Sequence, residues 1–309
     1  MKRLATDLRK VPLDTAFYKM QKTGLADSEF GLDNTPELID GGFGLYSTVN
    51  MAAGIGPVKT EFFRIALTRS GAVDISLALQ SFRTQRNTLV FGFPGQVFSL
   101  QNKSEDFFAY YILFTEDFIN RLPALKDIRA RYPFMNYNGV QSFQLSEEEG
   151  LETEDIIHKI NGEIKLGHAN MVEAIGLYTQ LILLQSYRSY ERQQLAKQED
   201  PMSSNGLFKK FIKLVGQHFL TLRKVSDYAG LLHVSPGYLN KVIKSQSDKT
   251  AHELIDEMIL TEAKAYLLHS QFSVAEIAYK LEFADPSHFN KFFRKHTGQT
   301  PSAYKSVLK

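Results

Sequence analysis

Residues 225–244 read VSDYAGLLHVSPGYLNKVIK, and residues 274–295 read VAEIAYKLEFADPSHFNKFFRK. The two stretches follow one pattern. Val225 corresponds to Val274 at an offset of 49 residues, and Pro236 corresponds to Pro286 at an offset of 50. The second copy therefore carries one extra residue in the turn before its second helix, where a loop tolerates an insertion that a helix would not.

Each copy has the pattern of a helix-turn-helix. Ser235 and Asp285 stand where a side-chain oxygen accepts from the first turn of the second helix. Pro236 and Pro286 follow at the first helical position, where a missing N–H costs nothing. The apolar residues of each second helix then recur at three- and four-residue spacing: Leu239, Val242 and Ile243, and Phe289, Phe292 and Phe293. This spacing predicts that each second helix buries one face.

The opposite face of each second helix is polar and basic. It carries Gly237, Asn240, Lys241 and Lys244 in the first copy, and Ser287, Asn290, Lys291 and Arg294 in the second. Residues 205–309 hold 15 Lys and Arg against 9 Asp and Glu, while residues 1–204 hold 21 against 25. Two helical hairpins with solvated basic faces are the alternative. Two similar caps and two matched Asn-Lys pairs instead favour contact with the major groove of DNA.

Residues 222–305 resemble the DNA-binding domain of the AraC/XylS family of bacterial transcription regulators. The resemblance rests on AEIAYKLEFADPSHFNKFFRKHTGQTPSAYK at 275–305, with its ending F-x-x-F-F-[RK]-K-x-x-G-x-T-P-x-x-Y. There Gly298 suits the left-handed residue that stops a helix, and Thr300-Pro301 suits the start of a last helix that returns Tyr304 to the core. Glu282 departs from the pattern, since the family usually has glycine at that position, and it predicts a slightly different turn.

A linker helix is expected between the two copies. Thr250-Ala251-His252-Glu253 has the form of a capping box that opens a helix to about Leu268. That helix is apolar around much of its girth, so it is expected to pack between both copies. The resemblance implies that it spaces the two second helices for successive major grooves, roughly 34 Å apart.

The resemblance also assigns roles to single residues. The candidate DNA-binding residues are Ser235, Gly237, Asn240, Lys241, Lys244, Pro286, Ser287, Asn290, Lys291, Arg294 and Lys295. Among them, the base-facing positions are Gly237, Asn240, Lys241, Pro286, Ser287, Asn290 and Lys291. Lys244, Arg294 and Lys295 lie further along and are expected at phosphates, which set affinity more than sequence choice. His288 and His296 are expected to be structural or to face phosphates.

The residues ahead of this domain predict a second domain of antiparallel strands, so the fold class is multidomain α+β. Five stretches between about 40 and 115 alternate as strands do: GFGLYSTVN, KTEFFRIALT, AVDISLALQ, NTLVFGFPGQVFSL and FFAYYILF. Such strands suit a sandwich or a small barrel. The stretch around Pro94-Gly95-Gln96 resembles the cupin-like sensor domain common in this regulator family, and residues 1–145 are assigned to it.

Two helices are expected over residues 146–195, separated near Gly162 and Gly167. These helices carry more apolar residues than one buried stripe needs, so they are expected to pack on the β domain or on a second subunit. The resemblance implies that the chain dimerises through this segment. Residues 196–206 are polar and contain Pro and Ser, which predicts a linker. The DNA-binding domain is then expected over residues 207–309.

A small-molecule effector is possible within the β domain, and its identity is unknown from the sequence. Aromatic side chains alternate along the strands at Phe43, Tyr46, Phe62, Phe63, Phe91, Phe93 and Phe98, either as core or as the lining of an apolar pocket. Arg64 or Arg83 is then a candidate partner for an acidic group. All eight histidines lie at or beyond His158, so a metal-dependent cupin enzyme is not expected, and no cofactor is expected.

Composition excludes further classes of function. The chain has no cysteine, and a DNA-repair enzyme of this kind would need a reactive one to accept an alkyl group. No signal peptide and no membrane span are expected, which suits a cytoplasmic regulator. The resemblance implies contact with RNA polymerase, and activation is the commoner mode in the family. An architectural protein that binds DNA with weak specificity remains the alternative.

Overall fold

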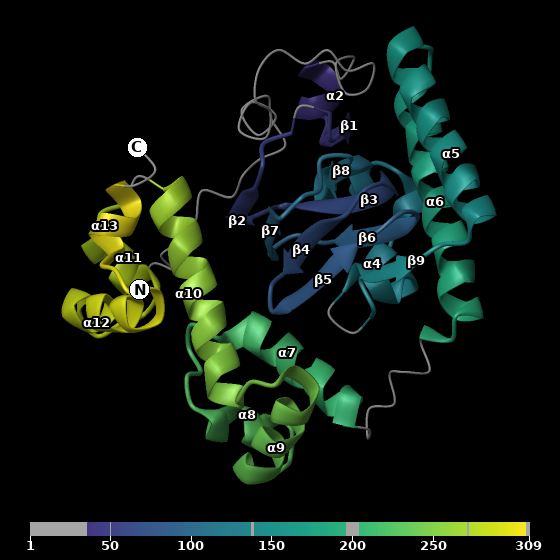
Figure 1. Cartoon of the computed structure of the whole chain (residues 1–309). Coiled ribbons are helices and arrows are strands. Elements are labelled where there is room, and N and C mark those ends of the chain that lie inside the picture. Colours follow the sequence, from purple (N-terminus) through teal and green to yellow (C-terminus); the bar gives the residue numbers. More distant parts are fainter. Residues whose placement is uncertain (1–35, 50, 137–138, 196–203, 271, 307–309) are drawn as a thin grey trace.

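The computed structural model describes residues 36–49, 51–136, 139–195, 204–270 and 272–306. The chain forms an antiparallel β part, two long helices that cover it, and a C-terminal set of helices beside it (Figure 1). This arrangement confirms the expected α+β class with strands ahead of the helical domain. None of the described helices is long and apolar enough to cross a membrane.

The strands form two antiparallel sheets. One has the order β1-β8-β3-β6-β9, and the other has the order β2-β7-β4-β5. The strands are β1 Phe43–Ser47, β2 Ile55–Lys59, β3 Phe62–Ser70, β4 Val73–Leu77, β5 Gln80–Thr84, β6 Thr88–Gly92, β7 Val97–Gln101, β8 Phe108–Thr115 and β9 Ser142–Gln144. The strand pairings that are described leave two sheets in place of a closed barrel.

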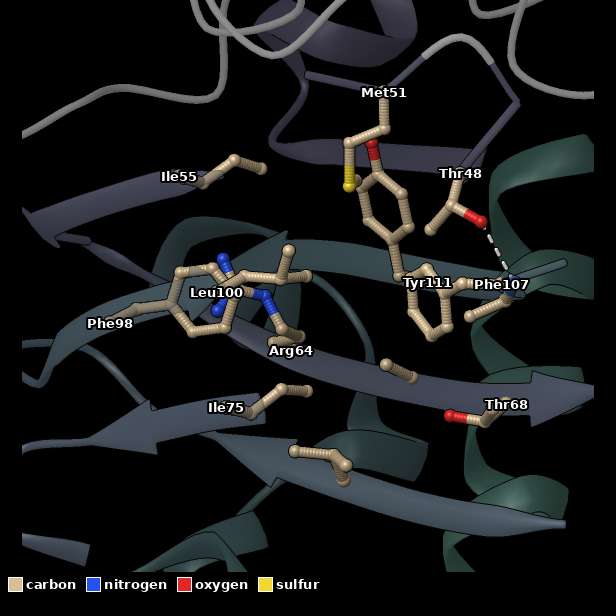
Figure 2. Close-up of a pocket in the computed structure, with 13 residues that line it drawn as sticks. Thr48, Met51, Ile55, Arg64, Thr68, Ile75, Phe98, Leu100, Phe107 and Tyr111 are labelled. Carbon is tan, nitrogen blue, oxygen red and sulfur yellow. Dashed lines mark hydrogen bonds between the residues drawn. The ribbon is translucent and has the colours of Figure 1, made fainter. Parts of the chain in front are cut away.

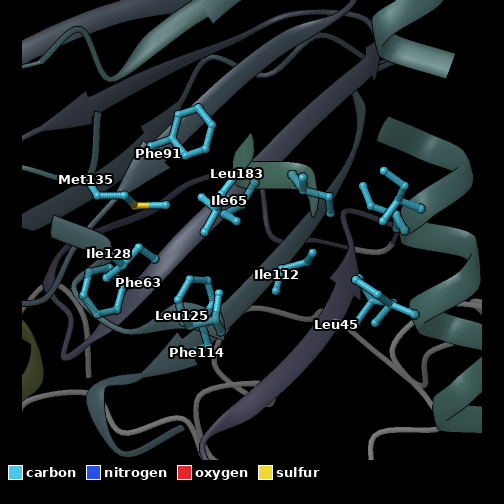
Figure 3. Packing of buried hydrophobic residues seen from close by; sticks show 14 of the residues in the cluster. Leu45, Phe63, Ile65, Phe91, Ile112, Phe114, Leu125, Ile128, Met135 and Leu183 are labelled. Carbon is cyan, nitrogen blue, oxygen red and sulfur yellow. The ribbon is translucent and has the colours of Figure 1, made fainter. Parts of the chain in front are cut away.

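The five-stranded sheet is buried on both faces, because side chains of a strand alternate between its two sides. On β3, Phe63 and Ile65 join a core with the helices, while Phe62 joins a second core between the two sheets. Figure 3 shows Phe63 and Ile65 packed in the first core together with Leu183. Polar Arg64 falls on the side that faces the other sheet, where it is 6% exposed.

The strand segments expected from the sequence coincide with five observed regions, and the long stretch at 87–100 divides into β6 and β7 at Pro94-Gly95-Gln96. Three short strands were not predicted from the sequence: β2, β5 and β9. Each lies at the edge of its sheet. An edge strand buries less apolar surface, so its sequence shows a weaker alternation of apolar and polar residues.

Two long helices cover the outer face of the five-stranded sheet. They are α5 Glu147–Leu166 and α6 Met171–Arg192. A capping box between Ser146 and Glu149 opens α5, and Gly167 in the left-handed conformation ends it. The helix runs through Gly162 without a break, so the expected separation lies at Gly167 alone. The pair leaves large apolar side chains exposed at Leu151, Leu166, Val172, Leu177 and Leu181.

Short helices connect the larger elements. They are α2 Pro36–Asp40, α3 Glu116–Asn120 and α4 Ile128–Arg131, with single 3₁₀ turns η1 at Pro123–Leu125 and η2 at Pro133–Met135. The expected linker at 196–206 lies largely outside the described residues, which resume at 204.

The C-terminal helices form two modules around a shared helix. They are α7 Ser204–His218, α8 Val225–Leu231, α9 Pro236–Ser247, α10 Ala251–His269, α11 Val274–Lys280, α12 Pro286–Thr297 and α13 Pro301–Ser306. Leu254, Ile255 and Met258 of α10 lie in the core of the first module, and Ala263 and Leu267 lie in that of the second. The linker helix therefore packs between both copies, as predicted from the apolar residues around most of its circumference.

The β part and the C-terminal helices are in contact. Strand β2 lies against α10, as Figure 1 shows. Lys59 on β2 donates to Glu262 Oε1 on α10 at 2.9 Å, and the Glu262 side chain is 1% exposed. Burial raises the pKa of Glu262.

Candidate nucleic-acid interface

The turns of the two modules begin with the same hydrogen bond. In the first, Val234 N donates to Ala229 O, and in the second Phe283 N donates to Ala278 O, each at 3.0 Å. His233 and Glu282 precede these donors, and both have φ of 56°. The difference from the family's turn that Glu282 predicts stays a prediction, because His233 and Glu282 belong to the same chain. A non-glycine residue adopts the left-handed conformation in both copies, at a cost of roughly 1–2 kcal/mol each.

The second helix of each module is capped as the sequence predicts. Ser235 Oγ accepts from Tyr238 N, while Asp285 accepts from the N–H groups of Ser287 and His288. These backbone donors hold the pKa of Asp285 below its usual range. Both helices carry proline in the first turn. The matched caps fix where each helix begins, and so they fix the direction in which its polar face points.

The end of the second module also agrees with the pattern. Gly298 terminates α12 at φ 78°, and its N–H donates to Arg294 O. Thr300 Oγ1 then accepts from Ala303 N at 3.2 Å at the start of α13. Tyr304 returns to the core, with its ring centroid 5.4 Å from that of Phe293.

One face of each second helix is buried. Leu239, Val242 and Ile243 hold α9 on the first core, and Phe289 and Phe293 hold α12 on the second. Phe292 is only partly buried, beside Phe283 at a centroid distance of 5.3 Å. The opposite faces remain at the surface.

Five basic side chains stand exposed on those faces: Lys241, Lys244, Lys291, Arg294 and Lys295. Within the part of the chain that is described, none of them lies in an ion pair of 4.0 Å or less. Lys249, by contrast, pairs with Glu257 at 2.7 Å. An anion such as a phosphate thus meets these five cations without first displacing a carboxylate.

The two matched asparagines are already engaged within the protein. Asn240 Oδ1 accepts from Ala251 N at 2.8 Å, which satisfies a free N–H at the start of α10. Asn290 Nδ2 donates to Pro286 O at 2.9 Å. A bidentate contact with adenine needs both polar atoms of the amide. Asn240 Oδ1 keeps a second lone pair and Asn290 Nδ2 keeps a second N–H, so each amide can contact a base only in the orientation that its internal bond permits.

The remaining candidate residues lie near the helix starts. Gly237 and Ser287 are exposed, and no atom lies within 4 Å of where a Cβ on Gly237 would stand. Ser235 is exposed, with its hydroxyl engaged in the cap, and Pro286 is partly buried.

The histidines of the second module lie beside carboxylates. His288 Nδ1 is 3.0 Å from Asp285 Oδ2 within α12 and its cap. His296 Nε2 is 3.3 Å from Asp256 Oδ2, which joins α12 to α10. His296 therefore has a structural contact of the kind expected.

Sequence reasoning missed a contact between the modules. Arg223 lies over the Phe283 ring, 4.4 Å from its centroid, and donates to Leu281 O. Burial lowers the pKa of Arg223. This arginine precedes α8 and touches the turn of the second module, so it helps α10 to fix the two modules relative to each other.

Most of the aromatic residues considered for a pocket are core. Phe43, Phe63, Phe91 and Phe93 lie in the core under the helices, and Tyr46 and Phe62 lie in the core between the sheets. Phe98 and Arg64 line the cavity between the sheets (Figure 2). Arg83 is half-exposed and pairs with Asp74 at 2.7 Å.

Comparisons with known proteins agree with this geometry. Residues 228–306 match a protein-family model described as a helix-turn-helix domain. The regulatory protein PocR of Salmonella typhimurium is 29% identical over 108 residues, which cover 35% of this chain and 36% of PocR. The Msm operon regulatory protein of Streptococcus mutans is 23% identical over 111 residues, covering 36% of this chain and 40% of that protein. The match thus spans well under half of the length of these relatives.

Among solved structures, ToxT from Vibrio cholerae matches over 87% of this chain and 98% of its own, with 14% identity and a TM-score of 0.41. The C-terminal domain of AraT from Geobacillus stearothermophilus matches over 33% of this chain and 84% of its own, with 24% identity and a TM-score of 0.31.

The C-terminal part of the chain is a helix-turn-helix domain. Its two modules around one linker helix make it a domain of the AraC type, which confirms the resemblance seen in residues 275–305.

Proposed function

We propose that this protein is a sequence-specific DNA-binding regulator of transcription. The observation that carries the proposal is the repetition of one capped helix with an exposed lysine at the same position, Lys241 in α9 and Lys291 in α12. Neither lysine has an ion-pair partner among the described residues. Two such helices held by one rigid linker helix suit two half-sites on a duplex, and their expected spacing is about one helical turn.

The roles proposed for the exposed cations differ by their place along each helix. Lys241 and Lys291 lie in the first half of their helices and face bases, where a well-placed contact discriminates by roughly 1–3 kcal/mol. Lys244, Arg294 and Lys295 lie a turn later and bind phosphates, which sets affinity and its salt dependence. The internal bonds of Asn240 and Asn290 hold their amides in place, while Lys241 and Lys291 are exposed.

The β domain, residues 1–145 in this proposal, senses a small molecule, and the segment 146–195 makes a homodimer. The cavity that Arg64 lines supports the sensing role. The exposed apolar side chains of α5 and α6 support the homodimer, and Leu177 among them is 55% exposed. Effector binding would then alter how residues 207–309 meet DNA and RNA polymerase in the cytoplasm. Activation is the proposed mode, by analogy with regulators that carry the same domain.

The first test measures which DNA the full chain retains. Purified protein is mixed with genomic fragments at physiological salt with excess random competitor, and the retained fragments are sequenced. We expect a few sites that hold two half-sites about one helical turn apart. Uniform retention that vanishes with added salt would overturn the proposal in favour of an architectural DNA-binding protein.

A second test assigns the reading faces. Lys241→Ala and Lys291→Ala are each expected to weaken binding to a retained site by roughly 5- to 150-fold, as the loss of one base contact implies. Lys126→Ala removes an exposed lysine from the β part and serves as the matched control. Unchanged affinity and preference in both interface variants would refute the assignment.

A further inference from the structure

A cavity lies between the two sheets of the β domain. It is lined by side chains from both, with Arg64 and Tyr111 on the five-stranded sheet and Ile75, Phe98 and Leu100 on the other (Figure 2). The cavity measures about 30 Å³. In this conformation it has room for one or two water molecules.

The charged group in this cavity is the guanidinium of Arg64. Its side chain is 6% exposed, and its Cζ lies 3.5 Å from the centroid of the Phe98 ring. The polar side chains that line the cavity with it are Tyr111, Thr48 and Thr68, and the others are apolar. Among the described residues, no carboxylate pairs with Arg64. Burial lowers the pKa of Arg64 to about 9, so the side chain still carries its charge at pH 7.

A second buried arginine shows that this fold pairs such groups elsewhere. Arg69, on the same strand, is 7% exposed, and its Nε lies 2.9 Å from Glu154 Oε2. It also bonds Asn87. A buried charge without a counter-ion costs several kcal/mol. The Phe98 ring offsets only part of the cost of burying Arg64, whereas Arg69 has a carboxylate partner.

The lining of the cavity defines what would neutralise Arg64. A guanidinium matches a carboxylate in a bidentate geometry. The lining also holds the hydroxyls of Thr48 and Thr68, of which Thr48 accepts from Ala109 N at 2.9 Å. The remaining walls are aliphatic and aromatic. An ion with several charges or many hydroxyls would leave polar groups unpaired there. The chemistry fits one negative charge on a compact apolar body.

We propose that this cavity binds a small apolar carboxylate, with Arg64 as its ion partner. This names the ligand class for the sensing role proposed above. Because the cavity is narrow, the ligand enters by displacing side chains that line it, Met51 and Ile55 among them (Figure 2). Arg64 turns from the Phe98 ring to the carboxylate, and the apolar body takes the space between the sheets.

The test uses the full chain and two probes, hexanoate and benzoate, with hexanol and benzyl alcohol as uncharged counterparts. Binding is followed by calorimetry and by the shift of the thermal midpoint. We expect the carboxylates to bind and the alcohols to bind at least about tenfold more weakly, because a charge-assisted bond is lost. Failure of both carboxylates to bind overturns the proposal.

Two variants make the result specific. Arg64→Met is expected to lose carboxylate binding by at least about tenfold and to raise the thermal midpoint of the ligand-free protein, because an uncompensated buried charge is removed. Arg83→Met removes an exposed arginine from the other sheet and is expected to bind as the native chain does. A lowered midpoint for Arg64→Met with unchanged carboxylate binding would show a structural role and overturn the proposal. Carboxylate binding is measured without DNA. Its outcome therefore does not depend on whether the chain selects particular DNA sites, and the proposals on DNA binding and on ligand class can fail separately.

Discussion

Replacing Lys59 by methionine tests whether the contact between the β domain and the linker helix holds in solution. The substitution keeps the length and apolar stem of the side chain and removes the only charge that an ion pair brings to Glu262 in the described structure. Glu262 is 1% exposed, so its carboxylate would remain buried without a partner. Such a group takes up a proton instead of staying charged.

The size of the effect follows from the pH. Keeping a carboxyl of ordinary pKa 4.5 protonated at pH 7 costs about 3 kcal/mol, since one pKa unit corresponds to about 1.4 kcal/mol. The loss of the pair places the folded pKa of Glu262 further above its unfolded value. The added cost is therefore absent below about pH 4.5 and grows as the pH rises. At pH 5 it is expected to be under about 1 kcal/mol.

The assay is urea unfolding of the full chain at pH 7 and pH 5. Far-UV circular dichroism is the signal, because the chain has no tryptophan. Burial already raises the pKa of Glu262 with Lys59 present, so the expected loss for Lys59→Met is at most about 3 kcal/mol at pH 7. The control adds Glu262→Gln to Lys59→Met, which removes the buried charge and should recover most of the loss. A loss that is equal at both pH values, or below about 0.5 kcal/mol at pH 7, would show that water reaches Glu262 and would refute the contact.

Three other predictions address the turns, an acid-sensitive ion pair and the dimer. Glu282→Gly is expected to stabilise the chain by roughly 0.5–1 kcal/mol in urea unfolding, because φ of 56° suits glycine, and His233→Gly should act alike in the first module; destabilisation by both would contradict the shared turn. Arg86 and Asn87 hold the pKa of Glu147 at about 2, so this group stabilises the fold above its ordinary pKa of 4.5, and the contribution is lost as the pH falls toward 2. Glu147→Gln should flatten the fall in thermal midpoint between pH 5 and pH 3, and an unchanged profile would exclude the pair as a cause. Leu177→Glu places a charge on the exposed apolar face of α6 and is expected to convert dimer to monomer in sedimentation, whereas a native chain that is monomeric at all concentrations would refute the proposed dimer.

The sequence determined those parts of the fold that depend on neighbours within about four positions. The caps at Ser235 and Asp285, the capping box at Thr250 and the stop at Gly298 all form as expected. Each is a contact between residues that the chain itself brings together, whatever the rest of the protein does. The period of the apolar positions likewise fixed the buried faces of α9 and α12.

Only the tertiary structure decided which polar groups meet across the chain. Asn240 has the same sequence context as a base-reading residue, yet its amide accepts from Ala251 eleven positions later. Arg64 and Arg83 were equal candidates by sequence, but packing buried Arg64 in the cavity and left Arg83 at the surface with Asp74. The pair of Lys59 and Glu262 joins residues 203 positions apart. Such contacts depend on how sheets and helices stack, and no local period or cap encodes that.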